Sequence, residues 1–220
     1  MTLADQFHDA CGMGLLAHLR RQSSHQLLQD AIRALTRMMH RGAVAADGKT
    51  GDGCGLLCAM PVGFMRQVAA EHGVSLPESF AVATLFLSDP IPQQEQFTEA
   101  CARNDLQAML FREVPLDTEA LGAYALARLP QIVQVFVVPR ELTATRRFDA
   151  LIYLTRKELE HALQGDPGFY VAAFSRTLLP YKGLVTPKNL AQLFPDLSRE
   201  EFATHLVLFH QRFSTNTLPQ

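Results

Sequence analysis

The 220-residue sequence contains no tryptophan, no strong excess of one charge and no apolar run long enough to cross a membrane. Its 20 Lys and Arg residues nearly balance 22 Asp and Glu residues, so the net charge of −2 gives no electrostatic reason to expect a nucleic-acid or anionic membrane partner. Apolar runs such as residues 80–87 are far shorter than the ~20 residues that a spanning helix needs. The first ten residues lack the basic and apolar regions of a secretory signal, so we expect a cytoplasmic protein.

Four cysteines are present, and a cytoplasmic location predicts that they are reduced thiols. Cys54 and Cys58 are four residues apart within a predicted strand, with His40 nearby in the sequence. No second pair accompanies them at the spacing of a zinc site, so we interpret both as small core thiols and expect no metal. The other two are Cys11 and Cys101.

Hydrophobic residues make up 48% of the sequence, which is enough for a sizeable core, and strand-like and helix-like segments alternate along the chain. Apolar and β-branched runs predict strands at residues 12–18, 54–60, 80–87, 107–114, 132–138 and 148–154, two within 168–185 and a last one at 204–215. Helical spacing and capping signals predict helices at 23–40, from Pro61 to Glu71, at 93–103 and 117–129, from Thr155 onward, and two short ones after Thr186 and Ser198. This order indicates an α+β domain whose sheets are covered by helices.

A glycine-rich segment and a polar segment are candidates for function. Residues 40–57 hold five glycines, which predicts tight turns or close backbone approach, and "GDGCG" within them lacks the Lys-Ser/Thr of a P-loop. The segment "HQRFSTNT" (210–217) places polar residues at the end of an apolar strand. Two interpretations stay open for it: a solvated strand end, or a cluster in which Arg212 binds a carboxylate while Thr215 and Asn216 bind an amine or amide.

Cys11 also has two interpretations. A lone cysteine is most often a small buried hydrophobe. Its place behind ten leading residues also permits its exposure as a new N-terminus, where its own α-amine, with a pKa of about 7.7–8.0, would accept the thiol proton near neutral pH. The enzyme would then need no histidine partner for this cysteine.

Several spaced motifs together resemble one family. In order they are "CGMGLLA" (11–17), "MHRGAVAADGKTGDGCGLL" (39–57), "FSRTLLPYKGL" (174–184) and "HQRFSTNT" (210–217), with "REVP", "PQIVQVF" and "IYLTRK" between them. They resemble the class II glutamine amidotransferase domain of glutamate synthases, and the resemblance covers essentially the whole chain. The last motif is specific to glutamate synthases among related amidotransferases.

The resemblance implies an Ntn-hydrolase-type αββα four-layer sandwich over residues 11–220, with two sheets between layers of helices. It implies removal of a leader, Met1–Ala10, which exposes Cys11 as the nucleophile that hydrolyses the glutamine side-chain amide to glutamate and ammonia. This reaction belongs to glutamate biosynthesis and ammonia assimilation. The resemblance also implies that Arg41 supports the loop of the nucleophile. It implies that Arg212 grips the glutamine α-carboxylate, with Phe213, Thr215 and Asn216 around it.

The resemblance also implies cofactors and partners outside this chain. In complete enzymes of this kind the ammonia reaches a distant domain that holds FMN and an iron–sulfur cluster. We expect no cofactor in this chain itself. Its expected partners are glutamine and the remaining glutamate synthase domains or small subunit, with no nucleic acid and no membrane.

One motif of the family is missing. In the family an Asn-Gly-Glu segment that forms the oxyanion hole follows "RFSTNT", whereas this sequence stops at Gln220. We therefore expect a partial domain that is incomplete at its C-terminus, and we expect the polar end of the 204–215 strand to be left unpaired, which exposes a sheet edge. The alternatives are a non-catalytic fragment or binding module, and an independent small amidohydrolase.

Overall fold

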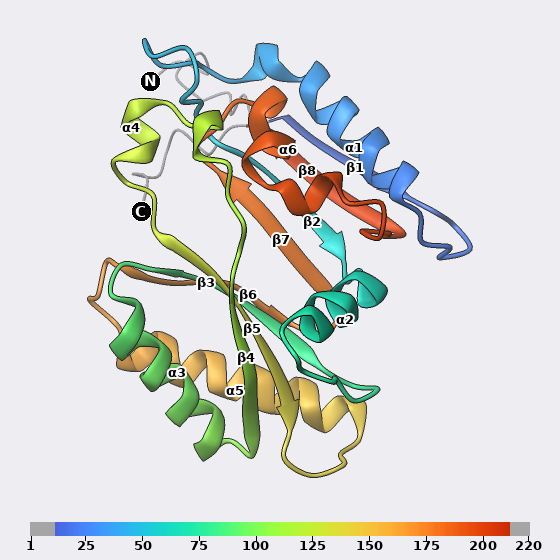
Figure 1. Cartoon of the computed structure of the whole chain (residues 1–220), viewed down its shortest axis with the longest axis vertical. Helices are drawn as coiled ribbons and strands as arrows, with labels where there is room; N and C mark the ends of the chain where they lie inside the picture. The colour runs from blue at the N-terminus through green and yellow to red at the C-terminus, as the bar shows by residue number, and fades with distance from the viewer. Residues whose placement is uncertain (1–11, 212–220) are drawn as a thin grey trace, which may run out of the picture.

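The structure, a computed structural model, describes residues 12–211, whose strands form two antiparallel sheets of four strands each (Figure 1). The first sheet has the strand order β1-β8-β2-β7, and the second has the order β4-β5-β3-β6. The strands are β1 (Gly12–Ala17), β2 (Cys54–Ala59), β3 (Ala81–Leu87), β4 (Leu106–Glu113), β5 (Gln131–Pro139), β6 (Phe169–Ser175), β7 (Leu178–Gly183) and β8 (Leu206–Gln211). Most of the predicted strands are therefore present, and the α+β class is confirmed.

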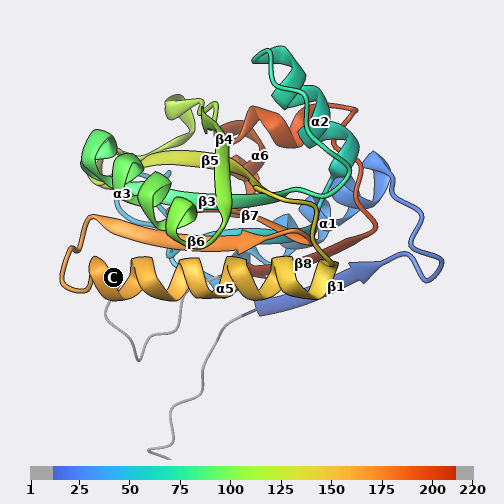
Figure 2. The ribbon, with the colours of Figure 1, turned by 90° about the horizontal axis from the view of Figure 1, so that it is seen from below.

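Helices cover the outer face of each sheet. They are α1 (His25–Arg37), α2 (Val62–Glu71), α3 (Pro90–Arg103), α4 (Ala123–Leu126), α5 (Thr145–Ala162) and α6 (Leu190–Leu193), with short 3-10 helices η2 (Met39–Arg41), η3 (Thr118–Ala120), η4 (Pro187–Asn189) and η5 (Pro195–Ser198). α3 and α5 pack on the second sheet, where α5 runs along β6, while α1 and α6 pack on the first sheet (Figures 1 and 2). This layer order confirms the predicted sandwich. Among the described helices, none is long and apolar enough to cross a membrane.

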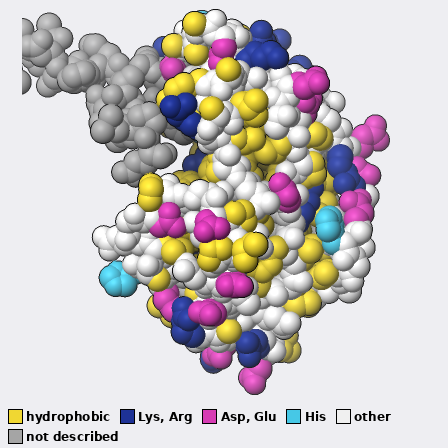
Figure 3. Space-filling model, turned by 60° about the vertical axis from the view of Figure 1, so that its left-hand side comes forward, with side chains coloured by type: hydrophobic (Ala, Val, Ile, Leu, Met, Phe, Trp, Pro, Cys, Tyr) yellow, Lys and Arg dark blue, Asp and Glu magenta, His cyan; other side chains and the backbone are white. Residues whose placement is uncertain are grey.

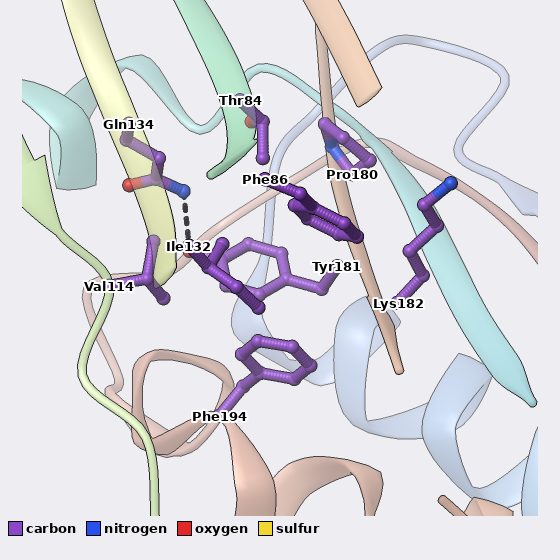
Figure 4. A pocket seen from close by; sticks show the side chains of 9 residues that line it. All are labelled: Thr84, Phe86, Val114, Ile132, Gln134, Pro180, Tyr181, Lys182 and Phe194. Atoms are coloured by element: carbon purple, nitrogen blue, oxygen red, sulfur yellow. Dashed lines mark hydrogen bonds between the residues drawn. The ribbon is translucent and has the colours of Figure 1, made fainter. Parts of the chain in front are cut away.

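A buried polar network joins the two sheets. The Arg112 guanidinium of β4 donates to both carboxylate oxygens of Asp196 and to Gln134 Oε1, each at 2.7 Å. The Tyr181 hydroxyl of β7 donates to Asp196 Oδ2 at 2.8 Å and accepts from Gln134 Nε2 of β5 at 3.3 Å, the contact drawn in Figure 4. The four hydrogen bonds of Arg112 and Asp196 involve ionised groups and are therefore stronger than neutral ones. Together with the Gln134–Tyr181 contact, they fix β7 against the second sheet.

The predicted strand at 148–154 is wrong, because these residues belong to α5. The helix buries Phe148, Ile152, Thr155 and Leu159, whose spacing of three or four residues is that of one helix face. Thr155 does not begin a helix either: its hydroxyl donates to the carbonyl one turn earlier at 2.8 Å. In the sequence, the apolar residues of this part of α5 form a short run that could not be distinguished from a short buried strand.

Smaller differences concern helix ends. The helix predicted from residue 23 has its N-cap at Ser24, whose side chain accepts from the Leu27 N–H at 3.2 Å, and α1 itself begins at His25. The helix predicted at 117–129 is reduced to η3 and α4, and Ser198 ends η5 instead of starting a helix. These segments are short, so local capping signals predict them poorly.

Strand β8 lies inside the first sheet, whereas residues 212–215, the polar end at which an unpaired sheet edge is expected, lie outside the described residues. It pairs antiparallel with β1 on one side and with β2 on the other. Among the described strands, the edges of this sheet are β1 and β7. The last strand in the sequence thus inserts between the first two, an order that strand patterns along the sequence do not reveal.

Candidate functional site

The candidate site lies at the end of the first sheet, where β1 and β2 begin and β8 ends. Gly12 pairs with Gln211, and Gln211 also pairs with Cys54, so the three residues form one row across the sheet. Gly12 directly follows Cys11 in the sequence, and Gln211 directly precedes Arg212. The sheet therefore pairs the residue that follows the predicted nucleophile with the residue that precedes the predicted carboxylate-binding arginine.

Arg41 packs over the start of β1. If Gly12 carried a Cβ, that atom would lie 3.3 Å from Arg41 Cγ and 3.0 Å from Met38 Cε. Both distances are tighter than ordinary van der Waals contacts, so the glycine makes room for the two side chains. The structure thus places Arg41 against the residue that follows Cys11. Its support of a nucleophile stays a prediction.

Gly42 makes a second close contact in this row. A Cβ at Gly42 would lie 2.0 Å from Gln211 Nε2. Gln211 is buried, and its Oε1 has no hydrogen-bond partner within residues 12–211. A buried acceptor without a partner costs about 1–3 kcal/mol, so this oxygen is available to a polar group at the site. Gln211 was not predicted from the sequence, although its position beside Arg212 was a signal.

The glycine-rich segment forms a tight loop beside the row. The Ala45 N–H donates to the Thr50 carbonyl at 2.8 Å and closes the loop. Gly53 has a φ of +105°, and a Cβ on Gly51 would lie 2.8 Å from the Val185 carbonyl oxygen. Only glycine fits these two positions, so the predicted tight turns and close backbone approach are confirmed.

Three of the four cysteines are buried thiols. Burial raises the pKa of each of them to about 12. They are Cys54, Cys58 and Cys101. At neutral pH such thiols stay protonated and are therefore poor nucleophiles. The interpretation of Cys54 and Cys58 as core thiols is confirmed.

His210 and Lys182 lie on the opposite face of the sheet from Gln211. They flank Gly55 on the two strands beside β2, and a Cβ there would lie 2.7 Å from Lys182 Cβ and 3.2 Å from His210 Cε1. Burial, and then the charge of Lys182, lower the pKa of His210. The imidazole is therefore neutral at pH 7.

A cavity between the two sheets is too small for an amino acid. Its lining includes Thr84, Gln134 and Tyr181, and its volume is about 10 Å³, which is room for about one water molecule (Figure 4). Residues 12–211 contain no group of three or more His, Cys, Asp or Glu side chains placed to hold a metal ion. The face in Figure 3 mixes acidic, basic and apolar side chains without a continuous patch of one sign.

Comparison with known families decides the assignment. The model of the glutamine amidotransferases of class II matches residues 11–220, from the first cysteine to the last residue of the sequence. The chain belongs to the class II glutamine amidotransferases.

Individual relatives of this amidotransferase chain are much longer proteins. It is 37% identical over 232 residues to the NADH glutamate synthase of Saccharomyces cerevisiae and 34% identical over 223 residues to that of Schizosaccharomyces pombe. It is 32% identical over 220 residues to the large chain of the NADPH glutamate synthase of Azospirillum brasilense. These alignments cover 96–98% of this chain but only 11–14% of the relatives. The chain thus spans roughly an eighth of their length.

Most of the predicted site residues of this amidotransferase lie outside the described residues. They are Cys11, Arg212, Phe213, Thr215 and Asn216, together with the predicted leader 1–10. Of the predicted site residues, the structure describes Arg41, whose side chain packs against Gly12, the residue that pairs with Gln211. The contacts of Gly12 and Gly42 were not predicted. A glycine in the sequence indicates that space is needed at its position in the fold, but it does not indicate which side chain fills that space.

Proposed function

We propose that this chain hydrolyses the side-chain amide of glutamine, with Cys11 as the nucleophile after removal of Met1–Ala10. The state of the other three cysteines carries the proposal: each is buried with a pKa of about 12, so none of them supplies a thiolate near neutral pH. The family match begins at Cys11, and the relatives above are glutamate synthases by name.

The proposed reaction uses the N-terminal amine as its base. The α-amine of Cys11 accepts the thiol proton, and the thiolate attacks the side-chain amide carbon of glutamine. The tetrahedral intermediate collapses as the protonated amine gives its proton to the departing nitrogen, which leaves as ammonia. The same amine then takes a proton from water, which attacks the glutamyl thioester and restores the thiol. In sum, glutamine and water give glutamate and ammonia.

We propose that Arg212 binds the α-carboxylate of glutamine, with Phe213, Thr215 and Asn216 around it. A planar guanidinium matches a carboxylate with two parallel hydrogen bonds, each hydrogen bond to a charged group being worth about 1.5–3 kcal/mol. The pairing of Gly12 with Gln211 supports this arrangement, because it keeps the chain segments that lead to the nucleophile and to Arg212 side by side.

We further infer that the ammonia serves a larger glutamate synthase in the cytoplasm. The length of the relatives supports this. The alignments cover 11–14% of each relative, so 86–89% of each lies outside the aligned part. FMN and an iron–sulfur cluster would belong to those other domains, with none of them in this chain. Its partners would be those domains or a small subunit.

The proposed nucleophile is tested with a glutamine analogue that carries a diazoketone in place of the amide. The diazo carbon takes up a proton, and the thiolate then displaces dinitrogen from it and forms a stable thioether. We expect one adduct per chain, located on Cys11 by peptide mapping, and slower labelling when glutamine is in excess. Intact mass should show that the labelled chains lack residues 1–10. Cys11→Ser, which keeps the size of the side chain, is the matched control and should not be labelled.

Two outcomes contradict the proposal. One is labelling of a cysteine other than Cys11, and the other is a wild-type chain that stays unlabelled under conditions in which it is folded. Glutamine binding by calorimetry without any labelling would instead support the alternative of a binding module.

A further inference from the structure

The carboxylate of Asp47 forms several hydrogen bonds within the loop beside the site. Asp47 Oδ1 accepts hydrogen bonds from the backbone N–H groups of Lys49 at 3.0 Å and Thr50 at 2.8 Å, and Oδ2 accepts from the Thr50 hydroxyl at 2.6 Å. These hydrogen bonds, that of the Thr50 hydroxyl first, lower the pKa of Asp47 to about 2. The carboxylate is therefore ionised at neutral pH and holds the turn in one conformation.

The same carboxylate meets a second segment of the chain. A Cβ on Gly122, directly before α4, would lie 2.1 Å from Asp47 Oδ2 and 2.3 Å from Thr50 Oγ1, so the two segments touch with no room for a side chain. Lys49 Nζ donates to the Glu119 carbonyl of η3 at 2.7 Å. We name the set of Asp47, Lys49, Thr50 and Gly122 the Asp47 clasp.

The other end of the loop touches both residues that flank the proposed site. The Arg41 side chain packs over Gly12, and the Gly42 backbone packs against the Gln211 side chain. Residues 43–46, which lie between these contacts and the clasp, are all exposed, so no core packing holds them. Hydrogen bonds tie the loop across its base, from the Ala43 N–H to Asp52 Oδ2 and from the Ala45 N–H to the Thr50 carbonyl, both at 2.8 Å. The contacts at its two ends then hold it against the rest of the chain.

We propose that Asp47 is a positioning residue for the glutamine site, an inference that rests on the proposed function. The Asp47 clasp fixes the loop, so that Arg41 and Gly42 keep their contacts with Gly12 and Gln211. Asp47 itself touches no reacting atom. Its loss frees the loop, which weakens binding of glutamine and leaves the nucleophile and its amine unchanged.

The test follows labelling of Cys11 in the full chain by the diazoketone analogue at rising concentrations, which separates the half-saturation concentration from the maximal rate. Asp47→Ala opens the clasp from one side, and Gly122→Ala opens it from the other. We expect each to raise the half-saturation concentration roughly fivefold or more, the lower end of couplings between separate sites. The maximal rate should change little, and amide hydrogen exchange over residues 43–50 should become faster.

Two control variants match these changes. Glu141→Ala removes an exposed carboxylate from the loop after β5, and Gly63→Ala adds a methyl group where no atom lies within 4 Å. Both should be labelled like the wild type. Asp47→Asn keeps an oxygen that accepts the two backbone N–H groups, so it should restore most of the binding that Asp47→Ala loses.

The outcomes separate this inference from the proposed function. A wild-type chain that is not labelled contradicts the proposed function itself. A labelled wild type with the same half-saturation concentration in Asp47→Ala and Gly122→Ala overturns the positioning role alone. A lower maximal rate and a lower thermal midpoint at an unchanged half-saturation concentration would show that Asp47 is purely structural, which also overturns it.

Discussion

Removal of the Arg112 side chain should destabilise the chain more than removal of any exposed arginine. Arg112 and Asp196 expose only 4% and 2% of their side chains, and two hydrogen bonds of 2.7 Å join them. Burial opposes the charge of Arg112, but the hydrogen bonds and charge of Asp196 outweigh it and raise the pKa of the guanidinium. Arg112→Met fills part of the space and leaves the Asp196 carboxylate buried with the Tyr181 hydroxyl as its remaining side-chain partner in the network.

The expected magnitude follows from burial. Removing one partner of a buried ion pair costs about 3–5 kcal/mol, because the other charge stays desolvated. Arg199→Met is the matched control, since Arg199 also binds a carboxylate with two hydrogen bonds, to Glu71 at 2.7 and 3.1 Å, but both side chains are partly exposed. An exposed pair contributes about 0.2–1 kcal/mol. The double variant Arg112→Met/Asp196→Leu removes both charges. Its free energy of unfolding should exceed that of Arg112→Met by about 1 kcal/mol or more.

Urea unfolding followed by circular dichroism measures these differences as shifts in the midpoint at a constant slope. The reasoning is refuted if Arg112→Met loses no more stability than Arg199→Met. It is also refuted if Asp196→Leu, added to Arg112→Met, lowers the free energy of unfolding further, because the cost would then lie in lost packing and not in an unpaired carboxylate.

Four further predictions concern buried thiols, a closely packed glycine and two buried hydroxyl groups. In the Cys11→Ser variant, Ellman's reagent should react with the three buried thiols only after unfolding, since their pKa is about 12, and rapid reaction of this variant in its native state would contradict their burial. Gly14→Ala should cost about 1–3 kcal/mol, whereas Gly63→Ala should be neutral or slightly stabilising, because a Cβ at Gly14 would lie 2.3 Å from Phe209 Cζ and one at Gly63 meets nothing. Thr84→Val should not destabilise the chain, because its buried hydroxyl has no partner within residues 12–211. Thr204→Val should cost about 0.5–1.5 kcal/mol, because its hydroxyl donates to the Ala59 carbonyl at 2.8 Å.

The strands were predictable from the sequence because each is bounded by local signals. β5 is a run of β-branched residues, and β2 ends before Pro61, so both can be read from a few neighbours. The strand predicted at 148–154 was wrong because an apolar run of that length also fits one side of a helix. The two are distinguished by the exposure of Ala150 and Leu154, which a strand would place on the same face as the buried Phe148 and Ile152. The insertion of β8 between β1 and β2 was not predictable, because pairing between distant strands leaves no local pattern.

The site illustrates the same limit at the level of single residues. The sequence pointed to Arg41 and to the glycine-rich segment, because residue types that carry charge or permit unusual backbone conformations are visible one at a time. It could not show that Gly42 receives the Gln211 side chain or that Gly122 receives the Asp47 carboxylate, since both contacts join segments far apart in the chain. In each of them a glycine on one segment leaves space for a polar side chain from the other. Where such a glycine faces an ionised or buried polar group, its replacement disturbs a specific contact, and for this reason Gly122→Ala tests the loop as directly as Asp47→Ala does.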